Sequence, residues 1–177
     1  MNTSDQFDLI LAECQQVFEA KTKDYGTSWR VLRPASLTDQ IYIKARRIRI
    51  IEEKGVQKVE EPIQNEYIGI INYCIIALIQ LDLEQETELN IAKEHVFKLY
   101  THYVAETKSL MLAKNHDYGE AWRNMRSTSF TDLILMKLMR IKQIERNEGK
   151  TEASENVEAG YTDIINYAVF ALILMQA

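Results

Sequence analysis

Residues 21–30 read Lys-Thr-Lys-Asp-Tyr-Gly-Thr-Ser-Trp-Arg, and residues 114–123 read Lys-Asn-His-Asp-Tyr-Gly-Glu-Ala-Trp-Arg. The second stretch repeats the first at an offset of 93 residues (114 − 21), and matches at this offset continue as far as Glu145. From Gly149 onward the matches run at an offset of 94, because the second half holds one extra residue. A repeat of this length predicts two similar substructures that pack on one another.

Each repeat is expected to form helices. The chain has only 6 glycines and 2 prolines, too few turn-forming residues for a sandwich, a barrel or a doubly wound sheet. The apolar spacing predicts three helices per repeat, over about 4–23, 36–53 and 62–83, and over about 89–115, 129–147 and 156–175. Glycine after Asp-Tyr suits a helix C-terminus, and Ser36 and Ser129 are expected to cap the second helices.

We therefore expect an all-α, six-helix bundle that forms a single compact domain over residues 1–177. Its two three-helix repeats span about 1–84 and 89–177. A duplicated unit packs like a homodimer fused into one chain, so the repeats should superpose through a rotation near 180° about a pseudo-two-fold axis.

The composition of the chain argues against several classes of protein. With 21 basic and 26 acidic residues the formal charge is −5, which argues against general nucleic-acid binding. The N-terminus lacks the pattern of a secretory signal, and the apolar run over 68–79 is too short to span a bilayer. Cys14 and Cys74 show no metal-binding or redox spacing. We expect a cytoplasmic protein with reduced thiols and no membrane association, which could form a homo-oligomer.

Two cations interrupt the apolar stripe of the second helix. At about 100° per residue, Lys44 lies between Ile48 and Ile51 on this stripe, and Arg47 lies at its edge. Lys137 and Arg140 repeat the placement. Since a buried lysine is costly without a partner, these cations belong either to structural ion pairs or to a site for an anionic ligand.

Other polar residues recur in both repeats and are also candidates. Asn72 and Asn166 interrupt apolar helices, where they could fix helix register through a buried hydrogen bond or contact a ligand. In the quoted segments an aromatic face with charged neighbours would suit a nucleobase and its phosphates. The candidates from these segments are Lys21, Asp24, Tyr25, Trp29 and Arg30, with their repeats Lys114, Asp117, Tyr118, Trp122 and Arg123.

The combination of Lys-x-x-Asp-Tyr-Gly-x-x-Trp-Arg, Ser-x-x-Asp, Lys-x-x-Arg-Ile and Ile-Ile-Asn-Tyr resembles the nucleotide-modification-associated domain, which occurs in tandem in short bacterial proteins. The resemblance covers nearly the whole chain. More distantly, the layout is similar to the MazG-like all-α nucleoside triphosphate pyrophosphatases. That similarity implies Mg²⁺ held by Glu-x-x-Glu and Glu-x-x-Asp motifs on neighbouring helices, and cleavage between the α and β phosphates of a nucleotide.

This chain departs from the MazG-like pattern. Neither copy of the first helix contains Glu-x-x-Glu. The Glu-x-x-Asp motif is split, because the first half has Glu66 with Gly69 and the second has Gly160 with Asp163. Either the halves complement each other at a shared site, or metal binding has been lost and ligand binding remains.

Our leading hypothesis is a Mg²⁺-dependent nucleotide pyrophosphohydrolase that acts on a nucleoside triphosphate or a modified nucleotide. The alternatives are a non-catalytic nucleotide-binding module and a purely structural helical bundle. In the leading hypothesis Asp24 and Asp117 are catalytic, and Glu66 and Asp163 bind the metal. A nucleotide or another phosphorylated small molecule would contact Lys21, Tyr25, Trp29, Arg30, Lys44, Arg47, Asn72, Lys114, Tyr118, Trp122, Arg123, Lys137, Arg140 and Asn166.

Overall fold

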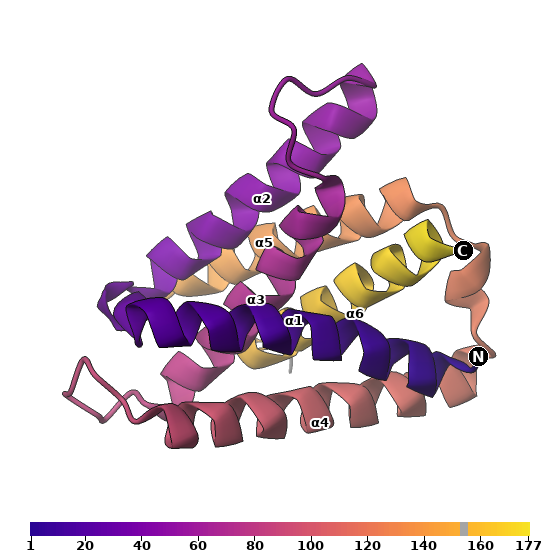
Figure 1. Ribbon diagram of the computed structural model, residues 1–177. Helices are drawn as coiled ribbons and strands as arrows, with labels where there is room; N and C mark the ends of the chain where they lie inside the picture. The colour runs from indigo at the N-terminus through magenta and orange to yellow at the C-terminus, as the bar shows by residue number, and fades with distance from the viewer. Residues whose placement is uncertain (153–155) are drawn as a thin grey trace.

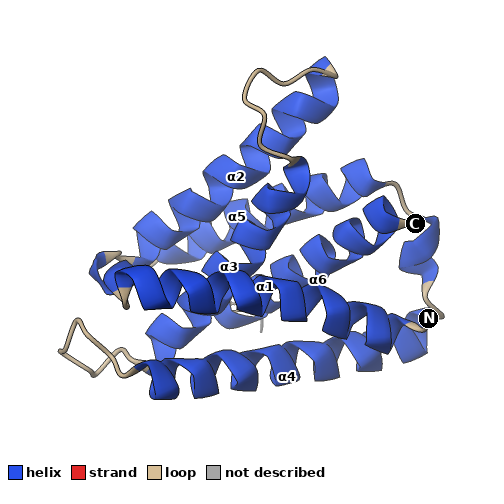
Figure 2. Cartoon of the chain, viewed as in Figure 1, coloured by secondary structure: helices blue, strands red, loops and turns tan. Residues whose placement is uncertain are grey.

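The fold is known from a computed structural model that describes residues 1–152 and 156–177. Over these ranges the chain forms six α-helices and two 3₁₀ turns and contains no strand, which confirms the all-α, six-helix prediction (Figures 1 and 2). The helices are α1 (Thr3–Tyr25), α2 (Pro34–Lys54), α3 (Ile63–Asp82), α4 (Lys93–Tyr118), α5 (Ser127–Arg146) and α6 (Val157–Gln176). The 3₁₀ turns are η1 (Ser28–Val31) and η2 (Ala121–Asn124), and each contains one of the two tryptophans.

The third helix of each repeat forms the centre of the protein. α3 and α6 pack against each other, α2 packs against α3, α5 packs against α6, and α2 and α5 also meet. α1 and α4 cover this group and contact both α3 and α6 (Figure 1). The central helices are apolar on nearly every side, because helices surround them and bury residues such as Ile75 and Val169 completely.

The glycines expected at helix C-termini lie where predicted, whereas the predicted N-termini of α2 and α5 differ from the observed ones. Gly55 and Gly119 follow α2 and α4 in the left-handed conformation. The prediction that Ser36 caps α2, and Ser129 caps α5, is wrong: these helices begin two residues earlier, and no side chain caps either start. For α2 the reason is Pro34, whose fixed φ and missing N–H fit the first position of a helix.

Thr131 joins the halves through a buried polar cluster. Its hydroxyl lies 2.9 Å from the hydroxyl of Tyr67 and donates to a carboxylate oxygen of Glu52 at 3.2 Å, and both of these partners belong to the first half. Burial raises the pKa of Tyr67 to about 12 and raises the pKa of Glu52 above its usual range. The equivalent residues of the opposite halves make the same contacts: Thr38, Tyr161 and Glu145.

Within the described residues, α6 is the one helix long and apolar enough to cross a membrane by length and composition. The same composition is typical of a core helix, and 61% of its apolar window is buried. α6 packs against α3 and α5, so its position in the bundle accounts for its apolar sequence.

Candidate functional site

A cavity of about 750 Å³ opens in the first half, between α1, η1, α2 and α3. Five of the predicted ligand-binding residues line it: Lys21, Tyr25, Trp29, Lys44 and Asn72. Tyr73, Glu61 and Gly69 also line it, and sequence reasoning did not select them as ligand contacts. The fold thus brings segment 21–30 together with the cation of α2, although Lys44 lies 14 positions after Arg30 in the chain.

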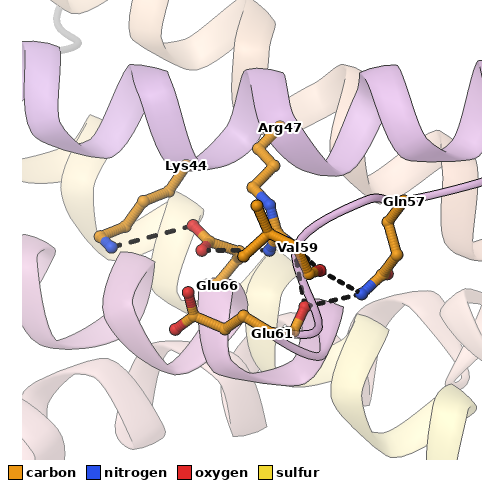
Figure 3. Close-up of polar contacts among 6 residues, drawn as sticks. All are labelled: Lys44, Arg47, Gln57, Val59, Glu61 and Glu66. Carbon is orange, nitrogen blue, oxygen red and sulfur yellow. Dashed lines mark hydrogen bonds and ion pairs between the residues drawn. The ribbon is translucent and has the colours of Figure 1, made fainter.

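Glu66 anchors a cluster of charges beside this cavity (Figure 3). Glu66 is 6% exposed, and its carboxylate lies 3.3 Å from Nη1 of Arg47 and 3.8 Å from Nζ of Lys44. Arg47 also donates through Nη2 to the backbone carbonyls of Val59 at 3.3 Å and Glu61 at 2.9 Å. Arg47 therefore has a structural role that fastens the α2–α3 connection, and it does not line the cavity.

Lys44 occupies a different position in the cluster. Its ammonium is too far from Glu66 for a hydrogen bond, and it lies 5.8 Å from the ring centroid of Tyr73. The lysine stem passes over Gly69, where an added Cβ would stand 3.0 Å from Cδ and Cε of Lys44. Because it is partly exposed and lines the cavity, Lys44 can meet an anion there while Arg47 balances Glu66.

Segment 21–30 contributes a lysine and two aromatic rings to the cavity wall. Lys21 and Tyr25 are exposed, and Trp29 is half-buried. The indole N–H of Trp29 is buried and has no hydrogen-bond partner in the described part of the chain. Asp24, a predicted catalytic residue, is exposed on the same helix and does not line the cavity.

In the second half, side chains of that half occupy the space beside the residues equivalent to Lys21, Lys44 and Trp29, and in this sense we call it the closed half. Asp163 takes the position of Gly69, and its carboxylate lies 3.0 Å from Lys137 Nζ and 2.8 Å from Lys114 Nζ. Trp122 is 5% exposed and stacks on Phe170, with centroids 4.2 Å apart and planes within 9°. This half therefore supplies an anion to its lysines and a ring to its tryptophan.

The remaining second-half candidates lie outside that closed region. Asp117 and Tyr118 are exposed, and Asp117 lies 3.2 Å from Nδ1 of His116. Arg140 lines a second hollow, of about 940 Å³, between α5 and the start of α6, and Lys137, which pairs with Asp163, borders the same hollow.

Arg30 ties η1 to the segment before α4, and Arg123 ties η2 to the start of α1. Arg30 donates to the backbone carbonyls of Glu86 at 2.9 Å and Glu88 at 3.1 Å, in the segment before α4. Arg123 donates to the side chains of Thr3 at 2.8 Å and Gln6 at 2.6 Å, in the first turn of α1. Both arginines are thus engaged by protein groups away from the cavity.

The two asparagines make buried contacts between helices. Asn72 donates to the carbonyl of Cys14 at 3.0 Å and accepts from the hydroxyl of Tyr100 at 2.8 Å, which uses both ends of its amide. Asn166 donates to the carbonyl of Thr107 at 3.4 Å, and its buried oxygen has no partner in the described residues. Asn72 therefore fixes the position of α3 against α1 and α4.

The two predicted metal ligands face cations of their own halves. Glu66 pairs with Lys44 and Arg47, while Asp163 pairs with Lys114 and Lys137. Within residues 1–152 and 156–177, no three His, Cys, Asp or Glu side chains gather in a way that could hold a metal ion. Mg²⁺ prefers oxygen ligands in octahedral geometry, and this donor set suits ion pairs better. The magnesium site stays a prediction, and no reaction step is derived through it.

Comparison with known proteins assigns both repeats to one family. A family model described as nucleotide modification associated domain 1 matches residues 21–81 and again residues 114–175. No curated protein and no solved structure matches. The two matched segments together cover more than half of the chain and coincide with the repeats found in the sequence. The chain therefore belongs to the nucleotide modification associated domain 1 family and carries two copies of the domain in tandem.

Proposed function

We propose that the cavity of the first half binds a nucleotide or another phosphorylated small molecule. The observation that carries this proposal is the convergence of Lys21 and Lys44 with the rings of Tyr25, Trp29 and Tyr73 around one cavity. Ammonium groups attract a phosphate, and aromatic faces stack on a base. Membership in a family associated with nucleotide modification supports the same ligand class.

Lys44 is the residue that tests this proposal best. Lys44→Met keeps most of the side-chain volume and removes the charge, while Arg47 continues to pair with Glu66. We expect nucleotide affinity to fall by about 1.5–3 kcal/mol, roughly 10- to 150-fold, with little change in melting temperature. Lys21→Met should weaken binding similarly. Isothermal titration calorimetry and thermal unfolding of the same samples measure both quantities.

Lys98→Met is a matched control, because Lys98 is an exposed lysine of α4 that does not line the cavity. It should bind nucleotide as tightly as the unmodified protein. Unchanged affinity in both cavity variants would contradict the proposal. So would a large drop in the melting temperature of Lys44→Met, since a stranded Glu66 would make the lysine a structural ion-pair partner.

Catalysis would extend binding, and it requires a separate measurement. Release of pyrophosphate from nucleoside triphosphates with Mg²⁺ tests the pyrophosphohydrolase hypothesis directly, and Asp24→Asn tests its predicted catalytic residue. A protein that binds nucleotides and releases no pyrophosphate would instead be the non-catalytic binding module. A protein whose unfolding no nucleotide shifts would be the structural bundle.

We also infer that the halves are related by the pseudo-two-fold axis expected of a MazG-like bundle. The support is reciprocity: Thr38 contacts Tyr161 across the halves, and the equivalent Thr131 contacts Tyr67. Such mutual contacts are the mark of an isologous interface. Superposition of 1–84 on 89–177 should therefore need a rotation of about 180°. A much smaller rotation, as between units stacked along one direction, would contradict this inference.

A further inference from the structure

The closed half shows which chemical groups fit beside the two lysines and the tryptophan that recur in both repeats. Between Lys114 and Lys137 it places a carboxylate, that of Asp163, within 3.0 Å of both ammonium groups. The equivalent first-half positions are Lys21, Lys44 and Gly69, and all three line the cavity. Glycine supplies no carboxylate: among the described residues Lys21 has no ion pair, and Lys44 has only the Glu66 carboxylate, at 3.8 Å, in place of the close anion that its counterpart holds.

The tryptophans of the two halves differ in a similar way. Phe170 lies flat against Trp122 in the second half. The equivalent first-half residues are Ile76 and Trp29, and both line the cavity. Because isoleucine has no ring, Trp29 lacks the stacking partner that Trp122 has.

Asp163 and Phe170 are seven residues apart on α6, which separates their backbones by about 10 Å along the helix axis. From this we propose that the first half binds one ligand in place of these two side chains, with a phosphate between Lys21 and Lys44 and a flat ring against Trp29. A nucleoside monophosphate has this form, with a sugar that spans the two ends. The inference rests on the proposed function and specifies its ligand class and its stoichiometry of one per chain.

The charges around the cavity favour one phosphate over three. Two ammonium groups face the anion in the closed half, and Lys21 and Lys44 offer the same number. Glu61 also lines the cavity, and Glu66 lies behind Lys44. Additional phosphates would bring negative charge toward these carboxylates without further cations, so a monophosphate should bind more tightly than a triphosphate in the absence of a divalent cation.

Gly69→Asp tests the inference, because it supplies the carboxylate of the closed half from within the protein. The variant should fold, since the contact that its Cβ makes is with the flexible stem of Lys44 and the backbone at Gly69 is helical. We expect affinity for nucleoside 5′-monophosphates to fall at least about 10-fold, with a melting temperature equal to or above that of the unmodified protein. Gly69→Ala is the matched control: it adds the same Cβ without the charge and should retain most of the binding.

Calorimetry with nucleoside 5′-monophosphates, the matching triphosphates, unphosphorylated nucleosides and inorganic phosphate separates the outcomes. Binding of one monophosphate per chain, more tightly than its triphosphate and its separate parts, and lost in Gly69→Asp alone, supports the inference. Equal binding by the Gly69→Asp and Gly69→Ala variants, tighter triphosphate binding, or two ligands per chain overturns it while nucleotide binding stands. Absence of binding by any phosphorylated compound overturns the proposed function as well.

Discussion

Replacing Lys114 and Lys137 together by methionine is expected to lower the free energy of unfolding by about 3–5 kcal/mol. The double variant removes both cations that lie within 3.0 Å of the Asp163 carboxylate. Asp163 is only 9% exposed, so water compensates its charge poorly, and an uncompensated buried charge is among the costliest single defects in a protein. Urea denaturation of the two proteins measures the difference.

Adding Asp163→Leu to the double variant provides the control. An apolar group of similar volume no longer needs a cation, and replacing a buried charged cluster in this way is often neutral or stabilising. The triple variant should therefore recover most of the lost free energy. If it is as unstable as the double variant, lost packing of the lysine stems explains the defect, and the charge of Asp163 does not.

Trp122→Ala is expected to cost about 3–5 kcal/mol of stability, because it removes a buried ring and leaves a cavity that the helices cannot fully close. Trp122 is 5% exposed, lies flat against Phe170, and supports the guanidinium of Arg123 at 4.4 Å from its ring. Thermal or urea unfolding of the variant measures this loss.

Trp29→Ala is the matched substitution in the other repeat. Trp29 is half-buried and lines the cavity, so its removal should cost less stability and weaken nucleotide binding more. Opposite effects in the two variants are the expected signature of one open and one closed half. Equal losses of stability, with nucleotide affinity unchanged in Trp29→Ala, would contradict that division.

The helices and the tandem repeat were predictable from the sequence, because both depend on information local in the chain. Apolar spacing and the scarcity of glycine and proline predict helices, and the matched segments of the family coincide with the repeats. The starts of α2 and α5 were mispredicted, because Ser36 and Ser129 are good caps in isolation while the helices begin at Pro34 and Ser127. For α2, the preference of Ser36 for a cap position is weak beside the geometry that Pro34 imposes.

Recurrence alone could not separate ligand-binding candidates from structural ones. Lys44 and Arg47 lie on one helix face and recur together, yet Lys44 lines the cavity while Arg47 fastens a loop. Arg30 belongs to the same sequence motif as Trp29 and reaches instead toward the segment before α4. Which partner a long side chain reaches depends on elements distant in sequence, and periodicity does not contain that information.

The difference between the halves was visible in the sequence, and its meaning was not. Gly69 stands where the second half has Asp163, and Ile76 stands where it has Phe170, as the offset of 94 shows. As part of a Glu-x-x-Asp motif, the difference between Gly69 and Asp163 suggested a split metal site. The fold places Asp163 between two lysines and Phe170 against a tryptophan. The same two differences therefore distinguish a half whose side chains occupy this space from a half in which the equivalent residues line a cavity.

The helical class, the duplication, the family and the recurring residues all follow from the order and spacing of residues along the chain. Which charges are neutralised, and which of the recurring residues line the first-half cavity, depends on the folded chain. The physical reason is that desolvation and ion pairing act over a few ångströms between atoms that the sequence holds tens of residues apart. Asp163 and Lys114 are 49 positions apart in the chain and 2.8 Å apart in the folded protein.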